Sequence, residues 1–276
     1  MTARRNLVVV RAGDQSVHPQ WLSDSDRNFD IFVSYFGKDE GRYADTADYH
    51  ENRKGMKWPV IGELLETRPE LAARYAYFWF PDDDLIADTD TINRMFDYAA
   101  AYRLALSQPA LTRDSYYTWP LLLQRDDYEL RFTRFVEVMA PVLDRDALRV
   151  CLPTFGENTS GWGLDWLWPR MLESRGEQAI AIIDATAVRH SRPVGGGELY
   201  KADGTSKARR EQQALLSKHG IDPGVLADGR HFFGGVRRFR QAWWRKAWLA
   251  LVHRVRGVNY RRLARRESRQ SPHLHP

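Results

Sequence analysis

The sequence has little from which to build covalent cross-links or membrane segments. Its 276 residues include one cysteine, Cys151, which excludes an internal disulfide and fits a reducing compartment. The apolar run at residues 7–10 is too short for a signal-peptide core. No uninterrupted apolar stretch approaches the length that spans a bilayer. We therefore expect a cytoplasmic protein.

Two phosphate-binding fingerprints are also missing. Neither G-x-G-x-x-G nor G-x-x-x-x-G-K-[ST] occurs in the chain. The sequence therefore predicts neither a dinucleotide site of the Rossmann type nor a P-loop, and any nucleotide must be held by other groups.

Charge is distributed unevenly along the chain. Residues 237–276 contain twelve Lys and Arg and one acid, a net charge of +11, so the remainder carries −6 of the overall +5. We expect a folded domain at residues 1–236 and a basic amphipathic, partly disordered tail at 237–276. Trp244, Trp248 and Leu251 share one face of a helix there, which fits an anionic membrane surface or packing on the domain equally well. No nucleic-acid recognition motif accompanies the charge, so no nucleic-acid partner is expected.

Apolar runs and helical spacings alternate in the first half of the chain, which predicts an α/β fold. We expect a mostly parallel sheet with helices on both faces, and an irregular loop at residues 38–55. The predicted strands are residues 7–10, 29–37, 75–80, 104–107, 128–138 and 179–184. The predicted helices are residues 58–67, 91–102, 163–172 and 207–219.

The third predicted strand ends in three consecutive carboxylates, Asp82, Asp83 and Asp84. Adjacent anions repel one another unless a cation compensates them. In an extended chain Asp82 and Asp84 project to one side, at the strand end where open α/β sheets bind ligands. Two hard oxygen ligands suit Mg²⁺ or Mn²⁺, with Asp83 beside the bound nucleotide. The alternative is a solvated turn before a helix that is capped by Asp88 or Asp90.

Other polar residues fall on the same predicted rim. Arg11, Gly13 and Asp14 follow the first strand, so we predict that they contact a nucleotide. Lys54 and Lys57 surround a glycine just before a helix and could bind a diphosphate through their charge and the helix N-terminus. The alternative for the lysines is a solvated loop without contacts.

Residues 157–169 are rich in tryptophan. Trp162 and Trp166 offer flat faces that suit the apolar face of a sugar ring, and Glu157 opens the same segment, so we predict acceptor contacts from all three. Asp165 among tryptophans would be partly desolvated, which raises the pKa of a carboxylate and suits a general base. The alternative is a core segment in which Asp165 caps a helix. Farther along, His190 follows a buried strand and is a candidate third metal ligand, although a lone histidine is more often structural.

Together these motifs resemble a GT-A type glycosyltransferase, and the chain is similar to a family catalogued as domain of unknown function 707. The matching stretches are residues 5–13, 32–37, 80–85, 135–141, 160–166 and 190–195. The resemblance implies a GT-A fold and a nucleotide-sugar donor. It makes Asp82 to Asp84 the D-x-D element for a divalent ion, Asp165 the base of an inverting enzyme and His190 a late metal ligand. Leu164 stands where this pattern often carries Glu.

The expected activity is therefore metal-dependent transfer of a sugar from a nucleotide-sugar donor to a hydroxyl of a glycan or glycolipid. The tail would allow a peripheral position at the inner face of the membrane. Two alternatives remain open: a metal-dependent phosphodiester or nucleotide hydrolase, and a non-catalytic adaptor at a membrane surface.

Overall fold

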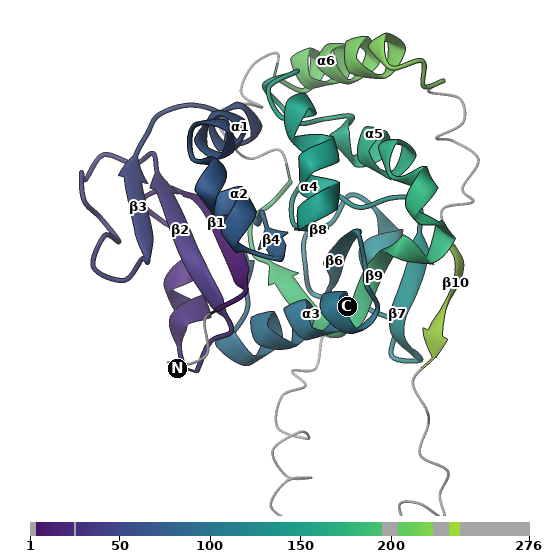
Figure 1. Ribbon diagram of the computed structural model, residues 1–276, viewed down its shortest axis with the longest axis horizontal. Coiled ribbons are helices and arrows are strands. Elements are labelled where there is room, and N and C mark those ends of the chain that lie inside the picture. Colours follow the sequence, from purple (N-terminus) through teal and green to yellow (C-terminus); the bar gives the residue numbers. More distant parts are fainter. Residues whose placement is uncertain (1–3, 25, 195–203, 223–231, 238–276) are drawn as a thin grey trace, which may run out of the picture. The chain divides into compact units, whose positions relative to one another are not determined.

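The computed structural model describes residues 4–24, 26–194, 204–222 and 232–237, all within one compact unit, Met1–Arg237 (Figure 1). The predicted tail beyond Arg237 and the glycines at 195–197 lie outside the described residues. Within the described ranges, no helix combines the length and the apolar character needed to cross a bilayer.

A mixed sheet forms the centre of the unit, in the order β10-β7-β9-β6-β8-β4-β1-β2-β3, and β5 pairs with β9 (Figure 1). The strands are β1 (Asn6–Ala12), β2 (Phe29–Tyr35), β3 (Tyr49–Asn52), β4 (Tyr77–Trp79), β5 (Leu85–Ile86), β6 (Leu106–Leu111), β7 (Tyr128–Thr133), β8 (Val142–Asp144), β9 (Ile180–His190) and β10 (Phe232–Arg237). The helices are α1 (Lys57–Thr67), α2 (Pro69–Arg74), α3 (Thr89–Ala101), α4 (Arg145–Cys151), α5 (Leu164–Met171) and α6 (Gly204–Lys218).

The first half of the sheet is parallel. Strands β3, β2, β1 and β4 run in one direction, so their carboxyl ends meet at one edge. Strand β8 then enters antiparallel between β4 and β6, and β9 returns parallel to β6. The predicted α/β class with a largely parallel centre is confirmed, and the antiparallel strands β7, β8 and β10 complete it.

Strand β4 is buried between two layers, as its aromatic sequence predicts. Phe78 and Phe80 stack on one face with ring centroids 6.3 Å apart, and Trp58 of α1 packs 5.8 Å from Phe80. On the other face Trp79 lies 5.1 Å from Trp21. The strand therefore fixes the position of the acid triplet that follows it.

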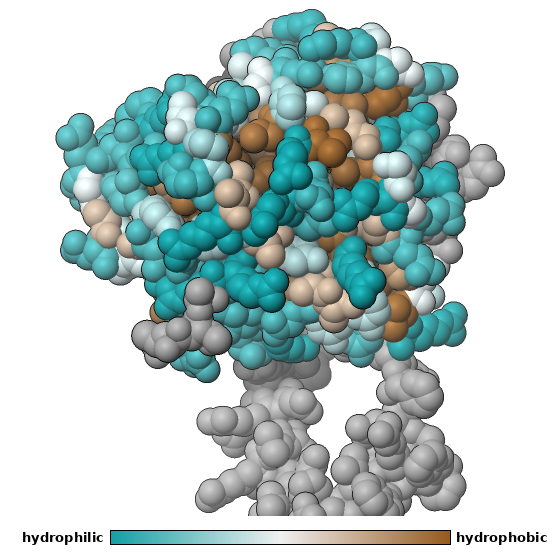
Figure 2. Space-filling view, in the orientation of Figure 1, coloured by the Kyte–Doolittle hydropathy of each residue, from teal (hydrophilic) through white to brown (hydrophobic). Residues whose placement is uncertain are grey.

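Figure 2 shows apolar residues gathered in a hollow between α1 and the α4–α5 region, on a face that is otherwise mostly hydrophilic.

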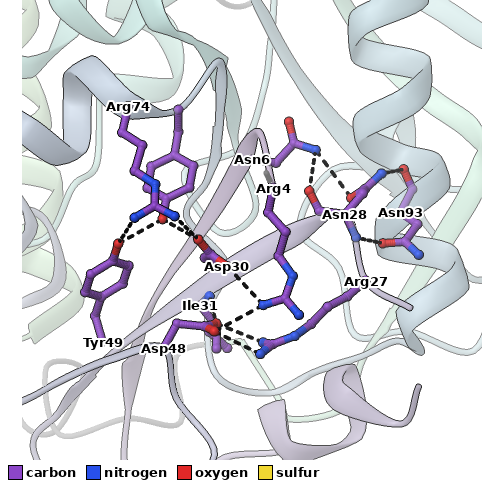
Figure 3. Close-up of polar contacts among 11 residues, drawn as sticks. Arg4, Asn6, Arg27, Asn28, Asp30, Ile31, Asp48, Tyr49, Arg74 and Asn93 are labelled. Carbon is purple, nitrogen blue, oxygen red and sulfur yellow. Dashed lines mark hydrogen bonds and ion pairs between the residues drawn. The ribbon is translucent and has the colours of Figure 1, made fainter. Parts of the chain in front are cut away.

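A polar network holds the amino ends of β1 and β2, away from the carboxyl-end rim (Figure 3). Asp30 accepts hydrogen bonds from Arg4 at 3.0 Å and from the Tyr75 hydroxyl at 2.5 Å. Asp48 accepts from Arg4 at 3.1 Å and from Arg27 at 3.0 Å. Hydrogen bonds and ion pairs thus connect these residues to one another. The candidate site lies at the opposite end of the strands.

Some elements differ from those predicted. The loop at residues 38–55 contains β3, a strand of polar sequence that pairs with β2 and forms the edge of the sheet within the described residues. Strand β9 extends beyond the predicted residue 184 to His190. Asp88 caps α3 by accepting from the Thr91 amide at 2.8 Å, so the predicted cap exists beside the acid triplet. Short elements such as β8 and α4 carry too few residues for a periodic signal.

Candidate active site

The acid triplet lies in the turn between β4 and β5, at the carboxyl edge of the parallel strands. Lys57, the first residue of α1, donates to Asp82 Oδ1 at 2.6 Å. The same ammonium group donates to the carbonyls of Val138 at 2.9 Å and Met139 at 3.2 Å. Burial lowers the pKa of Lys57, and the charge of Asp82 opposes this shift. Lys57 is therefore part of the site, and it compensates one of the three acids.

Asp83 ties the end of β1 to the triplet. Its Oδ2 accepts from the Gly13 amide at 2.8 Å, and its Oδ1 lies 3.1 Å from the Arg192 guanidinium. A Cβ at Gly13 would lie 3.0 Å from the Phe36 ring, so only glycine fits without a shift. Two predicted rim residues, Gly13 and Asp83, thus meet. Arg192 was not predicted as a site residue, although it lies in the matching stretch 190–195.

Asp84 meets His190. The antiparallel pairing of Leu85 with His190 brings the end of β9 beside the triplet, and His190 Nε2 lies 3.2 Å from Asp84 Oδ2. His190 Nδ1 lies 2.7 Å from the Tyr116 carbonyl, so it donates there and leaves Nε2 facing the acid. Burial alone would lower the pKa of His190, but the hydrogen bond and charge of Asp84 raise it overall.

The donor set at this point fits a divalent ion in part. Among the described residues, Asp84 Oδ1 is a buried oxygen without a hydrogen-bond partner, and His190 is oriented by a carbonyl as metal-binding histidines are. Asp82 points to Lys57 instead. Across the described ranges, no group of three His, Cys, Asp or Glu side chains is placed to hold a metal ion. An ion at this position would take Asp84 and His190 and complete its ligands with phosphate oxygens and water.

Two further carboxyl groups have raised pKa values, and one of them, Glu137, interacts electrostatically with Asp82 of the triplet and with the other, Asp165. Asp165, in the first turn of α5, is 9% exposed, and burial raises its pKa to about 7. Its Oδ1 accepts from the amides of Gly163 at 3.2 Å and Trp166 at 3.1 Å. Burial, followed by the charge of Asp165, raises the pKa of Glu137 to about 8, and His190 also acts on Glu137 electrostatically. Sequence reasoning missed Glu137, for which the only signal was the matching stretch 135–141.

Arg11, a predicted nucleotide contact, is engaged inside the fold. Its guanidinium donates to the Ser34 hydroxyl at 2.6 Å and to the carbonyls of Arg53 at 2.8 Å and Gly55 at 2.9 Å. Burial lowers its pKa to about 10. Arg11 therefore shapes the rim loops, and direct contact with a nucleotide stays a prediction.

Asp14 and Lys54 also bind neighbouring loops. The Asp14 carboxylate accepts from the Tyr35 hydroxyl, and the Lys54 ammonium donates to the carbonyls of Phe36 and Gly37. These contacts connect the ends of β1 and β2 to the segment before α1. Nucleotide binding by both residues stays a prediction.

The three predicted acceptor residues differ in their burial and in their contacts. Glu157 Oε2 lies 2.9 Å from both Lys218 Nζ and His219 Nε2, so it holds the C-terminal end of α6. Trp162 is half-buried. Trp166 is 5% exposed and packs against neighbouring rings, which leaves little of its face for a ligand. Acceptor binding by these three stays a prediction, and a different tryptophan, Trp119, is exposed beside Trp166.

Comparison with solved structures supports this fold. The crystal structure of S. aureus TarS 1-349 in complex with UDP-GlcNAc has a TM-score of 0.50 at 10% identity, over 77% of this chain and 66% of that chain. A crystal structure of S. aureus TarS has a TM-score of 0.48 at 9% identity, over 80% of this chain and 41% of that chain. This chain thus covers 66% of the length of the first structure and 41% of the length of the second.

Sequence comparisons add one finding. No curated protein sequence matches the chain. The model of the family described as "Protein of unknown function (DUF707)" matches residues 125–222, which include Glu137, Asp165 and His190. Over those residues, the match confirms the family that the sequence motifs indicated.

Proposed function

We propose that this chain is a glycosyltransferase that transfers a sugar from a nucleotide-sugar donor to a hydroxyl of a glycan or glycolipid. The observation that carries the proposal is the meeting of Asp84 with His190 at 3.2 Å, next to Lys57 and within electrostatic reach of the Glu137–Asp165 pair. The proposed phosphate-binding rim and the candidate base Asp165 are thus connected through Glu137. The fold shared with TarS 1-349, crystallised with UDP-GlcNAc, supports a nucleotide-sugar donor and makes UDP-GlcNAc the first donor to test.

Each residue has a role in this proposal. Asp84 and His190 would hold a divalent ion, Mn²⁺ or Mg²⁺, which supplies charge that stabilises a departing diphosphate. Lys57 and Arg192 add positive charge at the same rim. Asp165 accepts the proton of the acceptor hydroxyl, because its pKa of about 7 suits a base at neutral pH. Direct attack assisted by one base is the inverting route.

The experiment that tests the proposal is product analysis with the full chain, Mn²⁺ and a panel of nucleotide sugars that begins with UDP-GlcNAc. Glycosyl transfer, or slow donor hydrolysis in the absence of acceptor, releases a nucleoside diphosphate and the free or transferred sugar. Release of a sugar phosphate with a nucleoside monophosphate would instead support the hydrolase alternative. A folded protein that consumes no donor under any of these conditions contradicts both.

A transferase that needs no divalent ion is the second candidate. The triplet already has Lys57 at Asp82, Arg192 at Asp83 and His190 at Asp84, three basic partners for three acids. These side chains alone could offset the repulsion among the carboxylates. Donor turnover that persists in EDTA would favour this candidate.

The cellular placement also belongs to the proposal. A cytoplasmic enzyme whose basic tail reaches an anionic membrane would act on a lipid-linked or surface glycan. Residues 238–276 lie outside the described part of the chain, so this step rests on their sequence alone. Liposome co-sedimentation of the full chain and of a truncation at Arg237 tests it, and equal binding to anionic lipid would contradict it.

A further inference from the structure

Three exposed aromatic side chains lie in one loop, between β6 and the short 3-10 helix η2 (Pro120–Leu122). Tyr116 is 48% exposed, Tyr117 45% and Trp119 36%. Exposed aromatic rings cost free energy in water, so three of them within four residues indicate a surface that meets a ligand. None of these residues was predicted as part of the site. We call them the aromatic loop.

One end of the aromatic loop is fixed to the candidate metal ligand. The Tyr116 amide donates to the His190 carbonyl at 3.1 Å, and His190 Nδ1 donates to the Tyr116 carbonyl at 2.7 Å. The His190 amide donates to the Ser115 hydroxyl at 3.1 Å. These hydrogen bonds hold the loop in register with the end of β9, where His190 meets Asp84.

The other end of the aromatic loop is fixed against Trp166, the residue that follows the candidate base Asp165. The Trp119 ring centroid lies 5.1 Å from that of Phe135 and 5.6 Å from that of Trp166, which directly follows Asp165. Trp119 is thus packed on one side and exposed on the other. Its orientation is set before any ligand arrives, so little side-chain entropy is lost on binding.

The position and chemistry of the aromatic loop point to a sugar ring. In the proposed mechanism, an acceptor must place its hydroxyl between the donor-binding rim at His190 and the base at Asp165. The aromatic loop contacts His190 at one end and Trp166, next to Asp165 in the sequence, at the other. The apolar C–H face of a pyranose matches a flat ring, and the tyrosine hydroxyls supply polar contacts at the edge. Ion pairs surround the loop, Arg113 with Asp126 at 2.8 Å and Arg189 with Asp114 at 2.9 Å, which disfavours an acyl chain.

We infer that Tyr116, Tyr117 and Trp119 form the acceptor subsite and that it binds the pyranose ring of a carbohydrate, with Trp166 as its buried support. This inference rests on the proposed transferase function. It differs from the sequence prediction, which placed acceptor contacts on Glu157, Trp162 and Trp166.

The test is saturation-transfer NMR of the full chain with cellotriose and chitotriose, and with sorbitol as an acyclic polyol. We expect signals from ring C–H protons of a trisaccharide but none from sorbitol. Tyr117→Ala and Trp119→Ala should each weaken trisaccharide binding by about tenfold, the scale of one lost aromatic contact. Tyr102→Ala is the matched control, because Tyr102 is 37% exposed at the C-terminal end of α3, and should leave binding unchanged.

Two results would overturn carbohydrate binding by the aromatic loop: no trisaccharide signal, or an equal loss in Tyr102→Ala. Failure of the transferase proposal is seen separately, by thermal shift of the same samples with UDP and Mn²⁺. UDP binding that survives Trp119→Ala while trisaccharide binding is lost supports both. Trisaccharide binding that depends on Trp119 in a protein that binds no UDP would support a carbohydrate surface and contradict its role as an acceptor subsite.

Discussion

His190 Nε2 lies 3.2 Å from Asp84 Oδ2, while the other ring nitrogen is bound to the Tyr116 carbonyl at 2.7 Å. The pairing of β5 with β9 creates this relationship, because Leu85 is opposite His190 in the ladder. Two candidate metal ligands from distant parts of the chain are therefore fixed by backbone hydrogen bonds. The same histidine connects the acid triplet to the aromatic loop.

Removal of Lys57 tests how the acid triplet is compensated. In Lys57→Met, Asp82 loses the ammonium group at 2.6 Å, so its carboxylate becomes available to Mn²⁺ as a third ligand, after Asp84 and His190. We expect Mn²⁺ without nucleotide to raise the melting temperature of this variant more than that of the wild type. Lys54→Met is the control, since Lys54 donates to backbone carbonyls. Equal Mn²⁺ responses in all three proteins would contradict a cation-accepting triplet.

Asp165→Asn should separate chemistry from donor binding. The general-base contribution is about 10²–10⁴-fold in rate, whereas the affinity for UDP should not change, because the proposal gives Asp165 a role toward the acceptor hydroxyl only. Asp146→Asn, in an ion pair with Arg149 whose side chains are 67% and 73% exposed, should be neutral. Steady-state kinetics and calorimetry measure the two quantities, and a variant with undiminished turnover would remove Asp165 from the mechanism.

The pH dependence of turnover follows from the same residue. Burial raises the pKa of Asp165 to about 7, and a base must be deprotonated to act. The value of kcat/KM should therefore rise as pH increases through about 7 and level off above it. This carboxyl should titrate within the range from about pH 5 to about pH 8, so a flat profile over that range would contradict the assignment of Asp165 as the base.

Glu137 should make the fold less stable as pH rises. Its pKa is raised to about 8 from the model-peptide value of 4.5, so between these values the folded state binds a proton that the unfolded state has lost. The contribution is therefore favourable at acid pH and is lost as pH rises toward 8, by up to ~1.4 kcal/mol per pH unit. Urea unfolding of the wild type and Glu137→Gln at several pH values measures it. Identical pH slopes for the two proteins would contradict it.

How much of this site follows from sequence depends on the kind of signal. The acid triplet, Asp165 and His190 were recognisable because acids at a strand end and a tryptophan-rich turn are local patterns. Their partners were not, since the contact of Lys57 with Asp82 depends on where α1 packs on the sheet. Glu137 owes its raised pKa to burial and to Asp165, which no local pattern encodes.

In the fold, too, local sequence patterns were predictable and long-range contacts were not. The aromatic sequence of residues 75–80 predicted a strand buried on both faces, and Trp21 packs against Trp79 on one face while Trp58 packs against Phe80 on the other. Strand β3 was missed because an edge strand needs no apolar face. The antiparallel position of β8 between β4 and β6 is a long-range choice, set by packing rather than by the sequence of Val142–Asp144.

Breaking a buried ion pair should destabilise the second half of the sheet. Arg131 donates to Asp184 at 2.8 Å, and both side chains are fully buried. Arg131→Met removes the guanidinium that donates to both Asp184 carboxylate oxygens and leaves the Arg125 amide as a donor, which costs about 3–5 kcal/mol. Arg113→Met, which breaks a pair that is 72% exposed on both sides, should cost less than ~1 kcal/mol. Chemical denaturation compares them, and equal losses would show that burial does not decide the effect.

The most direct test of the account is calorimetric titration of the full chain with UDP, in Mn²⁺ and in EDTA, for the wild type and Asp84→Asn. We predict that Mn²⁺ tightens UDP binding to the wild type by at least about tenfold, equivalent to ~1.4 kcal/mol, and has no effect on the variant. Asp90→Asn, on a side chain that is 77% exposed in α3, should behave as the wild type. UDP binding that is absent, or equally strong with Mn²⁺ and EDTA, would contradict a divalent-ion site at Asp84.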